Sequence, residues 1–439
     1  MSAATPAEMQ PDPSLMAREA MALVADLATI SDEPGRLTRL YLSPAHRRAA
    51  DRVRERMEEA GFATSIDPVG TVVGRYEGSR PGMPALLLGS HIDTVRDAGR
   101  FDGTLGVAVA LAVVADLARR NMRLPFAIEV LAFGDEEGVR FPSTLAGSRA
   151  LAGTFAFSTL AECDADGIAL VDALRDFGCD PSQIPAAARG RQDVLGYLEL
   201  HIEQGRVLEH EDQAIGIVSG ISGAMRLGCR VEGVSGHAGT STMQDRYDAL
   251  CGAAEMVLAI EEIARSRGHV VATVGRLAAA PGVVNVVPGG VEFTLDLRTI
   301  DDVERCQTVD EILRRCEGIA RGRGLGFEHE TFYDQPTTFC DAALKTILAG
   351  TLARFGLAPL ELQSGAGHDG LAIASLCPIA MLFVRCKDGV SHHPDEDVSG
   401  EDIIVACAVL AHFIEALEPE SIKYRCSAHH DGNASASRA

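Results

Sequence analysis

Basic residues are scarce relative to acidic ones in this chain of 439 residues. Lysine and arginine number 40 against 62 aspartates and glutamates, which gives a formal net charge of −22. A negative field of this size disfavours nucleic acids and anionic membranes as partners. It also repels a small anionic substrate, so a site for one needs local positive charge.

Long apolar runs and paired cysteine motifs are missing as well. No run reaches membrane-spanning length, and Met1 to Ser14 lacks the charged and apolar regions of a secretory signal. The 11 cysteines are scattered without CxxC spacing and are odd in number. These absences predict reduced thiols in a cytoplasmic protein.

The chain is too long for one typical core and predicts two domains. Helix and strand patterns alternate over 1–213, which predicts an α/β catalytic domain with a mainly parallel sheet and helices on both faces. Over 214–332 the pattern changes to that of a smaller α+β lid or dimerisation domain, inserted into the first. Residues 333–426 would complete the catalytic domain, and 427–439 would form a disordered tail.

Within these domains, particular helices and strands are expected from periodicity. The catalytic domain would have helices at 14–28 and 45–60. The inserted domain would have strands at 224–231 and 291–298, and helices at 246–267 and 303–323.

A histidine and an aspartate follow the apolar strand Ala85–Leu88. In an open α/β sheet, ligands bind just beyond the carboxyl ends of such strands, which places His91 where chemistry is usually done. Asp93 can hold the imidazole of His91 in one tautomer, as a carboxylate does for a metal-bound histidine.

Acidic residues stand at two further element ends. Asp102 precedes a buried helix expected over 105–117, where it is either a helix cap or a carboxylate placed to bridge two metal ions. The strand 126–133 runs into Asp135, Glu136 and Glu137. Three consecutive acidic side chains repel one another unless a cation or a shared proton relieves the repulsion. The alternative interpretation of this segment is a solvated charged turn.

Two more histidine-bearing segments follow. His201 and Glu203 would share one face of a short strand, since side chains repeat every second residue. His392 and His393 lie in a loop between Gly389 and Pro394, two residues that argue against regular structure.

Taken together, His-x-Asp after a strand, Asp-Gly before a helix, Glu-Glu after a strand, His-Ile-Glu-Gln-Gly and Ser-His-x-Pro resemble the dinuclear metallohydrolases of the M20 peptidase superfamily. The motifs stand in the family order and cover the chain from about Leu40 to Ala416. Within the superfamily, the chain is similar to the amidase branch, which contains N-carbamoyl-L-amino-acid hydrolases, allantoate amidohydrolases and β-ureidopropionases. His201 in the His-Ile-Glu-Gln-Gly element marks this branch, because peptidase members generally present a carboxylate in its place.

The resemblance implies a metal site and a catalytic pair. His91 and His201 would each serve one metal, Asp102 would bridge, and the other metal would be served by Glu137 and His392. Glu136 would be the general base and Asp93 would orient His91. The family pattern Ser-His-x-Pro selects His392 over His393. The remaining histidines match no motif and are expected on the surface or in loops; they are His46, His210, His269, His329, His412, His429 and His430.

These residue types suit two divalent ions. Imidazole nitrogens and carboxylate oxygens without cysteine fit Zn, Mn, Co or Ni and leave the choice among them open. Two such ions can lower the pKa of a bridging water and polarise a carbonyl, while a carboxylate accepts the proton and passes it to the leaving nitrogen.

A second set of residues would bind the substrate. The resemblance implies that His237 polarises the scissile carbonyl, sometimes from the partner subunit, although its Gly-rich loop could simply turn the chain. Arg298 matches the family's carboxylate anchor, with an edge-strand salt bridge as the alternative. The other expected contacts are Gln204, Asn285, Gly367 and His368.

The leading hypothesis is therefore a metal-dependent amidohydrolase that acts on allantoate or an N-carbamoyl-L-amino acid and releases ammonia and carbon dioxide. The alternatives are a peptidase or aminoacylase of the same superfamily, disfavoured by His201, and a non-catalytic metal-binding protein, disfavoured by Glu136. The resemblance also implies a homodimer through the inserted domain and closure of the two domains over the substrate.

Overall fold

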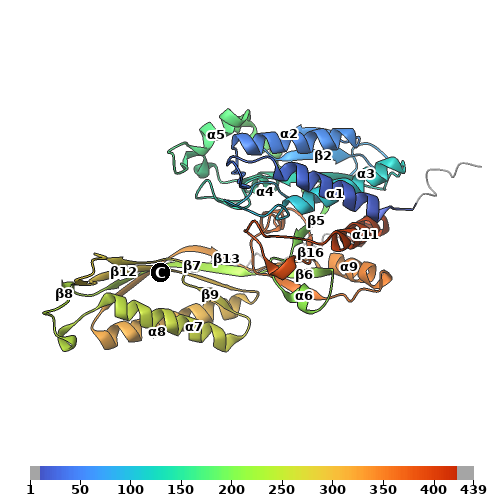
Figure 1. Cartoon of the computed structure of the whole chain (residues 1–439). Helices are drawn as coiled ribbons and strands as arrows, with labels where there is room; N and C mark the ends of the chain where they lie inside the picture. Colours follow the sequence, from blue (N-terminus) through green and yellow to red (C-terminus); the bar gives the residue numbers. More distant parts are fainter. Residues whose placement is uncertain (1–9, 423–439) are drawn as a thin grey trace, which may run out of the picture. The chain divides into compact units, whose positions relative to one another are not determined.

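The computed structural model describes residues 10–422, so the tail expected at 427–439 lies outside the described residues. The chain divides into two compact units (Figure 1). The smaller unit comprises Gly220–Phe339 and Gln363–Gly367, and the larger unit comprises the rest. The smaller unit starts later than the insertion expected at 214–332, because β6 (Ile215–Ile221) first pairs with the larger unit's sheet through Ile215, Gly216 and Ile217.

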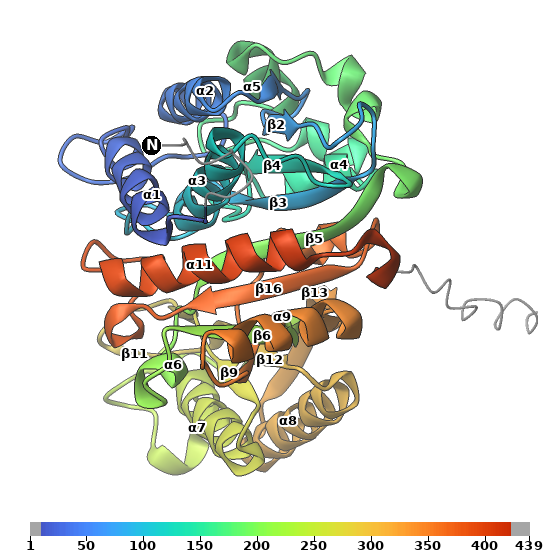
Figure 2. The same ribbon diagram turned by 90° about the vertical axis from the view of Figure 1, so that its right-hand side faces the viewer.

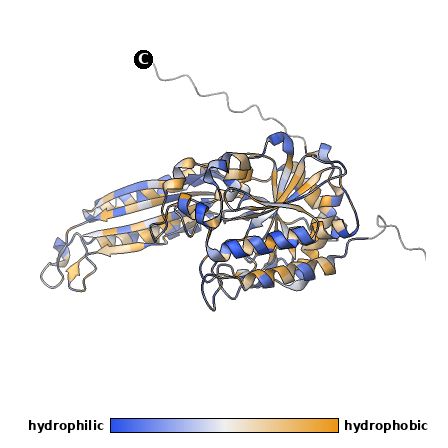
Figure 3. Ribbon diagram, turned by 90° about the horizontal axis from the view of Figure 1, so that it is seen from above, coloured by the Kyte–Doolittle hydropathy of each residue, from blue (hydrophilic) through white to orange (hydrophobic). Residues whose placement is uncertain are grey.

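The larger unit is built on a sheet with the strand order β1-β2-β4-β3-β5-β16-β6. Its four central strands are parallel and its outer pairs are antiparallel, which confirms a mainly parallel central sheet. The central strands β3, β4 and β16 are buried throughout and are mainly hydrophobic, and hydrophobic strands gather inside this unit (Figure 3). The strands are β1 (Ala63–Ile66), β2 (Val72–Tyr76), β3 (Ala85–His91), β4 (Ala127–Phe133), β5 (Val194–Ile202), β15 (Glu361–Ser364) beside β6, and β16 (Ile379–Val384).

Helices cover this sheet on both faces (Figure 2). The helices of the larger unit are α1 (Pro13–Ala28), α2 (Pro44–Glu59), α3 (Thr104–Arg119), α4 (Ala146–Leu151), α5 (Leu170–Phe177), α6 (Val207–His210), α9 (Ala342–Arg354), α10 (Gly370–Ile373) and α11 (Gly400–Ala416). Among the described helices, none is long and apolar enough to cross a membrane.

Helix α3 lies close against the centre of the sheet and is buried along nearly its whole length. A Cβ atom at Gly106 would lie 2.1 Å from the carbonyl oxygen of Leu200, so only glycine permits this approach. The start of α3 is thereby held next to the end of β5. Asp102, just before α3, and His201, on β5, are consequently neighbours.

One histidine expected on the surface or in a loop is buried in a helix instead. His46 belongs to α2 and has no exposed surface. Its Nδ1 accepts the N–H of Leu42 at 3.0 Å. Burial lowers the pKa of His46 to about 3, and the positive charges of Arg39 and Arg140 act in the same direction. The His46 ring is therefore uncharged and packs in the core. Because His46 belongs to no motif, the sequence did not indicate this burial.

The smaller unit has an antiparallel sheet in the order β10-β12-β7-β13, with β9 also paired to β12. Apolar side chains on one face of β7 and β12 pack against α7 and α8. The first of these helices begins at Ala249 rather than 246, because the Asp248 side chain accepts the N–H groups of Leu250 and Cys251. The elements are β7 (Gly223–Glu232), β8 (Gly236–His237), α7 (Ala249–Arg267), β9 (Val271–Thr273), β10 (Leu277–Ala280), β11 (Val286–Val287), β12 (Gly290–Thr299), α8 (Asp302–Arg323), β13 (Gly326–Gln335) and β14 (Thr338–Phe339).

Candidate metal centre

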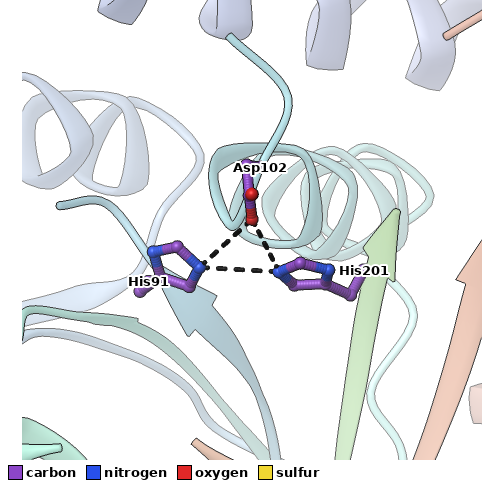
Figure 4. A group of neighbouring side chains, drawn as sticks. All are labelled: His91, Asp102 and His201. Carbon is purple, nitrogen blue, oxygen red and sulfur yellow. Dashed lines mark hydrogen bonds and ion pairs between the residues drawn. The ribbon is translucent and has the colours of Figure 1, made fainter. Parts of the chain in front are cut away.

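Two histidines and an aspartate converge in the larger unit (Figure 4). His91 ends β3, His201 lies near the end of β5, and Asp102 sits in the loop before α3. Asp102 Oδ1 is 3.0 Å from His201 Nε2 and 3.5 Å from His91 Nε2, and the two Nε2 atoms are 3.5 Å apart. All three side chains are buried. Three potential ligand atoms therefore point at one small volume.

The backbone fixes which nitrogen each histidine presents. The Nδ1 atom of His91 lies 3.0 Å from the carbonyl oxygen of Asp93, and that of His201 lies 2.9 Å from the carbonyl oxygen of Ile202. A carbonyl can only accept, so Nδ1 carries the proton and donates it. Each Nε2 is then left with a lone pair for a metal ion.

The expected role of the Asp93 carboxylate needs correction. It lies 3.7 Å from His91 Nδ1, and His91 is oriented by the backbone carbonyl of Asp93 instead. The two carboxylate oxygens accept the N–H groups of Glu136 and Glu137, each at 3.3 Å. Asp93 thus orients the histidine through its main chain and the two glutamates through its side chain.

A second ligand group shares Asp102 with the first. His392 Nε2 is 3.2 Å from Asp102 Oδ2 and 3.5 Å from Glu137 Oε2. His393 turns away and faces Asp395. The helix-cap alternative for Asp102 is wrong, since Gly103 is the N-cap of α3 and makes no side-chain cap bond. Asp102 offers one oxygen to each group, which is the arrangement of a bridging carboxylate.

Gln204 also contacts this carboxylate. Its Nε2 donates to Asp102 Oδ2 at 2.8 Å and to Ser391 Oγ at 3.0 Å, and Ser391 Oγ donates to Asp102 Oδ2 at 2.8 Å. Gln204 and His392 have φ angles of +58° and +56°, in the left-handed region that non-glycine residues seldom adopt. The structure thus uses Gln204 to hold Asp102, whereas the sequence suggested a substrate contact.

The acid that shares a face with His201 is Glu199, not Glu203. Strand β5 ends at Ile202, and the Glu203 carboxylate accepts the N–H groups of Val207 and Leu208 at the start of α6. Glu199 is fully buried and accepts from Ser90 Oγ at 3.3 Å and from the Gly370 N–H at 3.1 Å. The sequence could have predicted this, because residues two apart on a strand share a face and residues 199 and 201 both lie in β5.

Electrostatics distinguish the carboxylates of the site. Burial raises the pKa of Glu136 well above its usual value, and the neighbouring Glu137 raises it further. Burial likewise raises the pKa of Glu137 to about 7. Burial would also raise the pKa of Asp102, but His201, His392 and His91 outweigh it and hold that pKa well below its usual range. With no metal ion beside it, Glu136 therefore binds a proton more tightly than an ordinary glutamate does, while Asp102 stays ionised.

The donor set fits divalent cations. The ion-pair partners of Asp102 in the described chain are all histidines, so no lysine or arginine neutralises it there. The Oε1 atom of Glu137 is buried without a hydrogen-bond partner among the described residues. Within each group the ligand atoms lie within 4.8 Å of one another. Nitrogen and carboxylate donors without thiolate suit Zn, Mn, Co or Ni.

Four of the expected substrate-binding residues lie in the smaller unit, and none of them is buried; they are His237, Asn285, Arg298 and Gly367. His237 on β8 pairs with Val286 on β11, which places Asn285 beside that pair. His237 Nδ1 accepts the N–H of Gly239 at 3.1 Å, so in the neutral ring Nε2 carries the proton and can donate it. Gly367 is exposed and belongs to the smaller unit too.

The alternative interpretation of Arg298 was a salt bridge on an edge strand. The salt bridge is present, but the strand that carries Arg298 is not an edge strand. Strand β12 has neighbours on both sides, and Arg298 donates from Nε and Nη2 to Asp296 at 2.7 and 3.0 Å. Its Nη1 donates to the carbonyl oxygen of Gly365 at 2.8 Å. A guanidinium has five N–H groups, so one remains on each Nη atom.

His368 lies against the candidate metal centre and is buried. Only 1% of its surface is exposed, and its ring meets that of His201 edge to face with centroids 4.6 Å apart. Burial lowers the pKa of His368 well below its usual value, and His201 contributes in the same direction. This buried position does not match the expected substrate contact.

A buried arginine also supports the site, and no motif indicated it. Arg39 is fully buried and donates from Nε to the carbonyl oxygen of Ile92, between His91 and Asp93. Its backbone N–H donates to Thr94 Oγ1 at 2.9 Å. An arginine without a nearby motif reads as a surface residue, so only the fold shows this role.

Two ligand groups that share one carboxylate, beside a buried glutamate, define the site of a metal-dependent hydrolase. The comparison with known proteins agrees. The chain belongs to peptidase family M20/M25/M40, whose model matches residues 87–416.

Relatives with named activities cover most of the chain. The N-carbamoyl-L-amino acid amidohydrolase of Geobacillus stearothermophilus is 41% identical over 390 residues, covering 89% of this chain and 95% of the relative. The allantoate deiminase of Arabidopsis thaliana is 38% identical over 435 residues, covering 92% and 83%. A solved structure of a hydantoinase/carbamoylase family amidase from Burkholderia multivorans superposes with a TM-score of 0.83 at 32% identity, covering 91% and 97%. The resemblance to the amidase branch is confirmed.

Proposed function

We propose that this chain is a metal-dependent amidohydrolase that cleaves the ureido or carbamoyl C–N bond of a small carboxylic acid. Allantoate and N-carbamoyl-L-amino acids are the candidate substrates, since relatives named for acting on each align along most of the chain. The observation that carries the proposal is Asp102, whose two oxygens face two separate histidine-containing groups.

The proposed cofactor is a pair of divalent ions. His91 and His201 would hold one, Glu137 and His392 the other, and Asp102 both. When bound, the ions supply Lewis acidity toward a water molecule and toward the carbonyl oxygen of the substrate.

Glu136 is the proposed general base. Its Oε2 lies 3.9 Å from His91 Nε2, beside the first ligand group. Glu136 takes a proton from the attacking water, whose oxygen adds to the ureido carbon. The bond from that carbon to the terminal nitrogen then breaks, and the nitrogen leaves as ammonia with the proton from Glu136. The remaining carbamate loses carbon dioxide and leaves an amine. Because burial raises the pKa of Glu136, its carboxyl keeps the proton between these steps.

Arg298 and His237 are the proposed substrate contacts on the smaller unit. The two unused N–H groups of Arg298 lie on different Nη atoms, so they can donate side by side to a substrate carboxylate. The protonated Nε2 of exposed His237 can donate to a carbonyl oxygen. We also propose a homodimer through this unit, whose ten-residue strand β13 ends its sheet.

Ammonia release by protein loaded with Mn or Zn tests the function. The substrates are allantoate, N-carbamoyl-L-amino acids and N-carbamoyl-β-alanine, run beside dipeptides and N-acetyl amino acids. We expect turnover confined to the ureido set. Glu136→Gln should lower kcat by about 10²–10⁴-fold, the usual contribution of a general base, and leave bound metal unchanged. Hydrolysis of dipeptides or acetyl amino acids alone would contradict the proposal.

A further inference from the structure

One loop from the C-terminal part of the chain contacts Asp102 in several ways. Ser391 and His392 meet the Asp102 side chain at 2.8 and 3.2 Å. From the same loop, Glu396 Oε1 accepts the backbone N–H of Asp102 at 3.0 Å and that of Phe101 at 2.7 Å. The loop that supplies a ligand to the second group thus also binds the main chain around the shared carboxylate.

Glu396 is an unusual residue for such a position. Only 3% of its surface is exposed. Both backbone N–H groups donate to the same oxygen, and the other oxygen, Oε2, has no hydrogen-bond partner within residues 10–422. Among residues 10–422, no lysine, arginine or histidine forms an ion pair with Glu396, and burial of a carboxylate with only two amide donors is costly. Packing alone would be served at least as well by an apolar side chain.

Asp102 lies in the turn formed by residues 99–103, and the glycines at the two ends of this turn are tightly packed. A Cβ at Gly99 would lie 2.3 Å from Glu396 Cδ. A Cβ at Gly103 would lie 2.4 Å from His91 Nε2. The turn therefore has Glu396 directly against its first residue and a metal-facing imidazole directly against its last. Loss of the Glu396 carboxylate removes the two hydrogen bonds that it accepts from this turn.

We propose that Glu396 is a positioning residue, which sets the orientation of the Asp102 carboxylate through the two peptide N–H groups that it accepts. A rotation of these peptides would swing both Asp102 oxygens and so misalign both ligand groups together. This inference rests on the proposed function only in treating Asp102 as a metal ligand. The nearby pair between Arg100 and Asp397, 3.2 Å apart, has both side chains about half exposed and contributes little.

Binding of Co²⁺ to the full-length, metal-stripped protein tests the proposal, with absorption spectra and equilibrium dialysis as readouts besides activity. Glu396→Ala should weaken Co²⁺ binding by about 10–100-fold, as the loss of groups that orient metal ligands does. It should also change the Co²⁺ spectrum. In addition, it should lower kcat by a larger factor than it changes KM. Glu396→Gln should stay within about threefold of wild type, because its amide oxygen can accept the same two N–H groups. The matched control is Asp395→Ala, which removes an adjacent carboxylate whose side chain is 84% exposed, and it should bind Co²⁺ like wild type.

Three results would overturn the proposal. Glu396→Ala could lose melting temperature but keep Co²⁺ affinity, spectrum and kcat, which would make the residue merely structural. Glu396→Gln could fail as badly as Glu396→Ala, which would mean that charge, not hydrogen bonding, matters. Wild-type protein could bind no Co²⁺, which would remove the metal-ligand role of Asp102 as well. By contrast, a wild type that binds Co²⁺ yet hydrolyses no ureido acid would refute the proposed function and leave the Co²⁺ test of Glu396 in force.

Discussion

Replacement of Gly103 by alanine should separate backbone strain from damage to the metal centre. Gly103 has a φ of +62°, and an added Cβ would lie 2.4 to 2.5 Å from three atoms of the His91 ring, Nε2 among them. Ordinary contacts begin near 3.4 Å. The ring would therefore have to move by about 1 Å, whereas metal–ligand distances tolerate only about 0.2 Å.

The expected size of each effect can be worked from a matched glycine. Gly356 lies in the same unit with a φ of +71°, and a Cβ there would meet nothing within 4 Å. Gly356→Ala should thus cost only the left-handed conformation, about 1–2 kcal/mol in the free energy of unfolding. Gly103→Ala should incur at least that cost, because its φ of +62° and ψ of −52° lie outside the left-handed α region. It should in addition weaken metal binding by at least about 10–100-fold.

Thermal unfolding of the metal-free variants, followed by Co²⁺ titration of each, measures the two quantities separately. Gly356→Ala serves as the control that keeps wild-type Co²⁺ affinity despite its lower stability. If Gly103→Ala bound Co²⁺ as tightly as Gly356→Ala does, the argument that Gly103 makes room for the metal-facing nitrogen of His91 would be refuted.

Three further predictions concern other parts of the molecule. His46 has a pKa of about 3 in the folded chain against an ordinary 6.5, so the unfolded chain binds more protons below pH 6.5 and stability falls as pH drops from 6.5 toward 3. Its share is about 1.4 kcal/mol per pH unit; acid melts of His46→Asn, whose amide oxygen can still accept the Leu42 N–H, should show a correspondingly shallower fall. Arg298→Lys should raise KM for a ureido acid by about tenfold or more with a smaller change in kcat, because an ammonium cannot donate two parallel N–H groups to a carboxylate. An unchanged KM in steady-state assays would show that Arg298 does not bind the substrate carboxylate. Dialysis against a chelator should abolish turnover and lower the melting temperature, and added Zn, Mn, Co or Ni should restore both, since an ion that binds only the folded state stabilises it.

Much of the larger unit could be predicted because its signals are local. The apolar run that became β3 ends at the His-x-Asp motif, and the small residues of α3 predicted a buried helix. The ligand residues follow the carboxyl ends of strands, where an α/β sheet gathers its ligands. Residue type, place in the chain and the resemblance to the M20 superfamily together predicted which side chains meet.

The supporting contacts could not be predicted, because they depend on backbone geometry between distant segments. A pattern of residue types does not show that the Asp93 carbonyl, rather than its carboxylate, faces His91. Gln204 holds Asp102 through a left-handed backbone conformation that its type does not favour. Arg39 and Glu396 are charged residues that sequence reasoning places on the surface. Their burial follows from contacts with carbonyl and amide groups, which every residue has and which leave no pattern.

The order of the chain has a consequence for how the protein matures. His91, Asp102 and His201 are all synthesised in the first half of the chain, whereas the contacts from Ser391 and Glu396 to Asp102 span 289 and 294 residues. Such long-range contacts form late in folding, because a long loop must close before they are made. A nascent chain can consequently assemble the first ligand group before the second exists. We expect the second ligand group to form only after translation is complete, so that a truncated or stalled chain lacks the complete candidate metal centre.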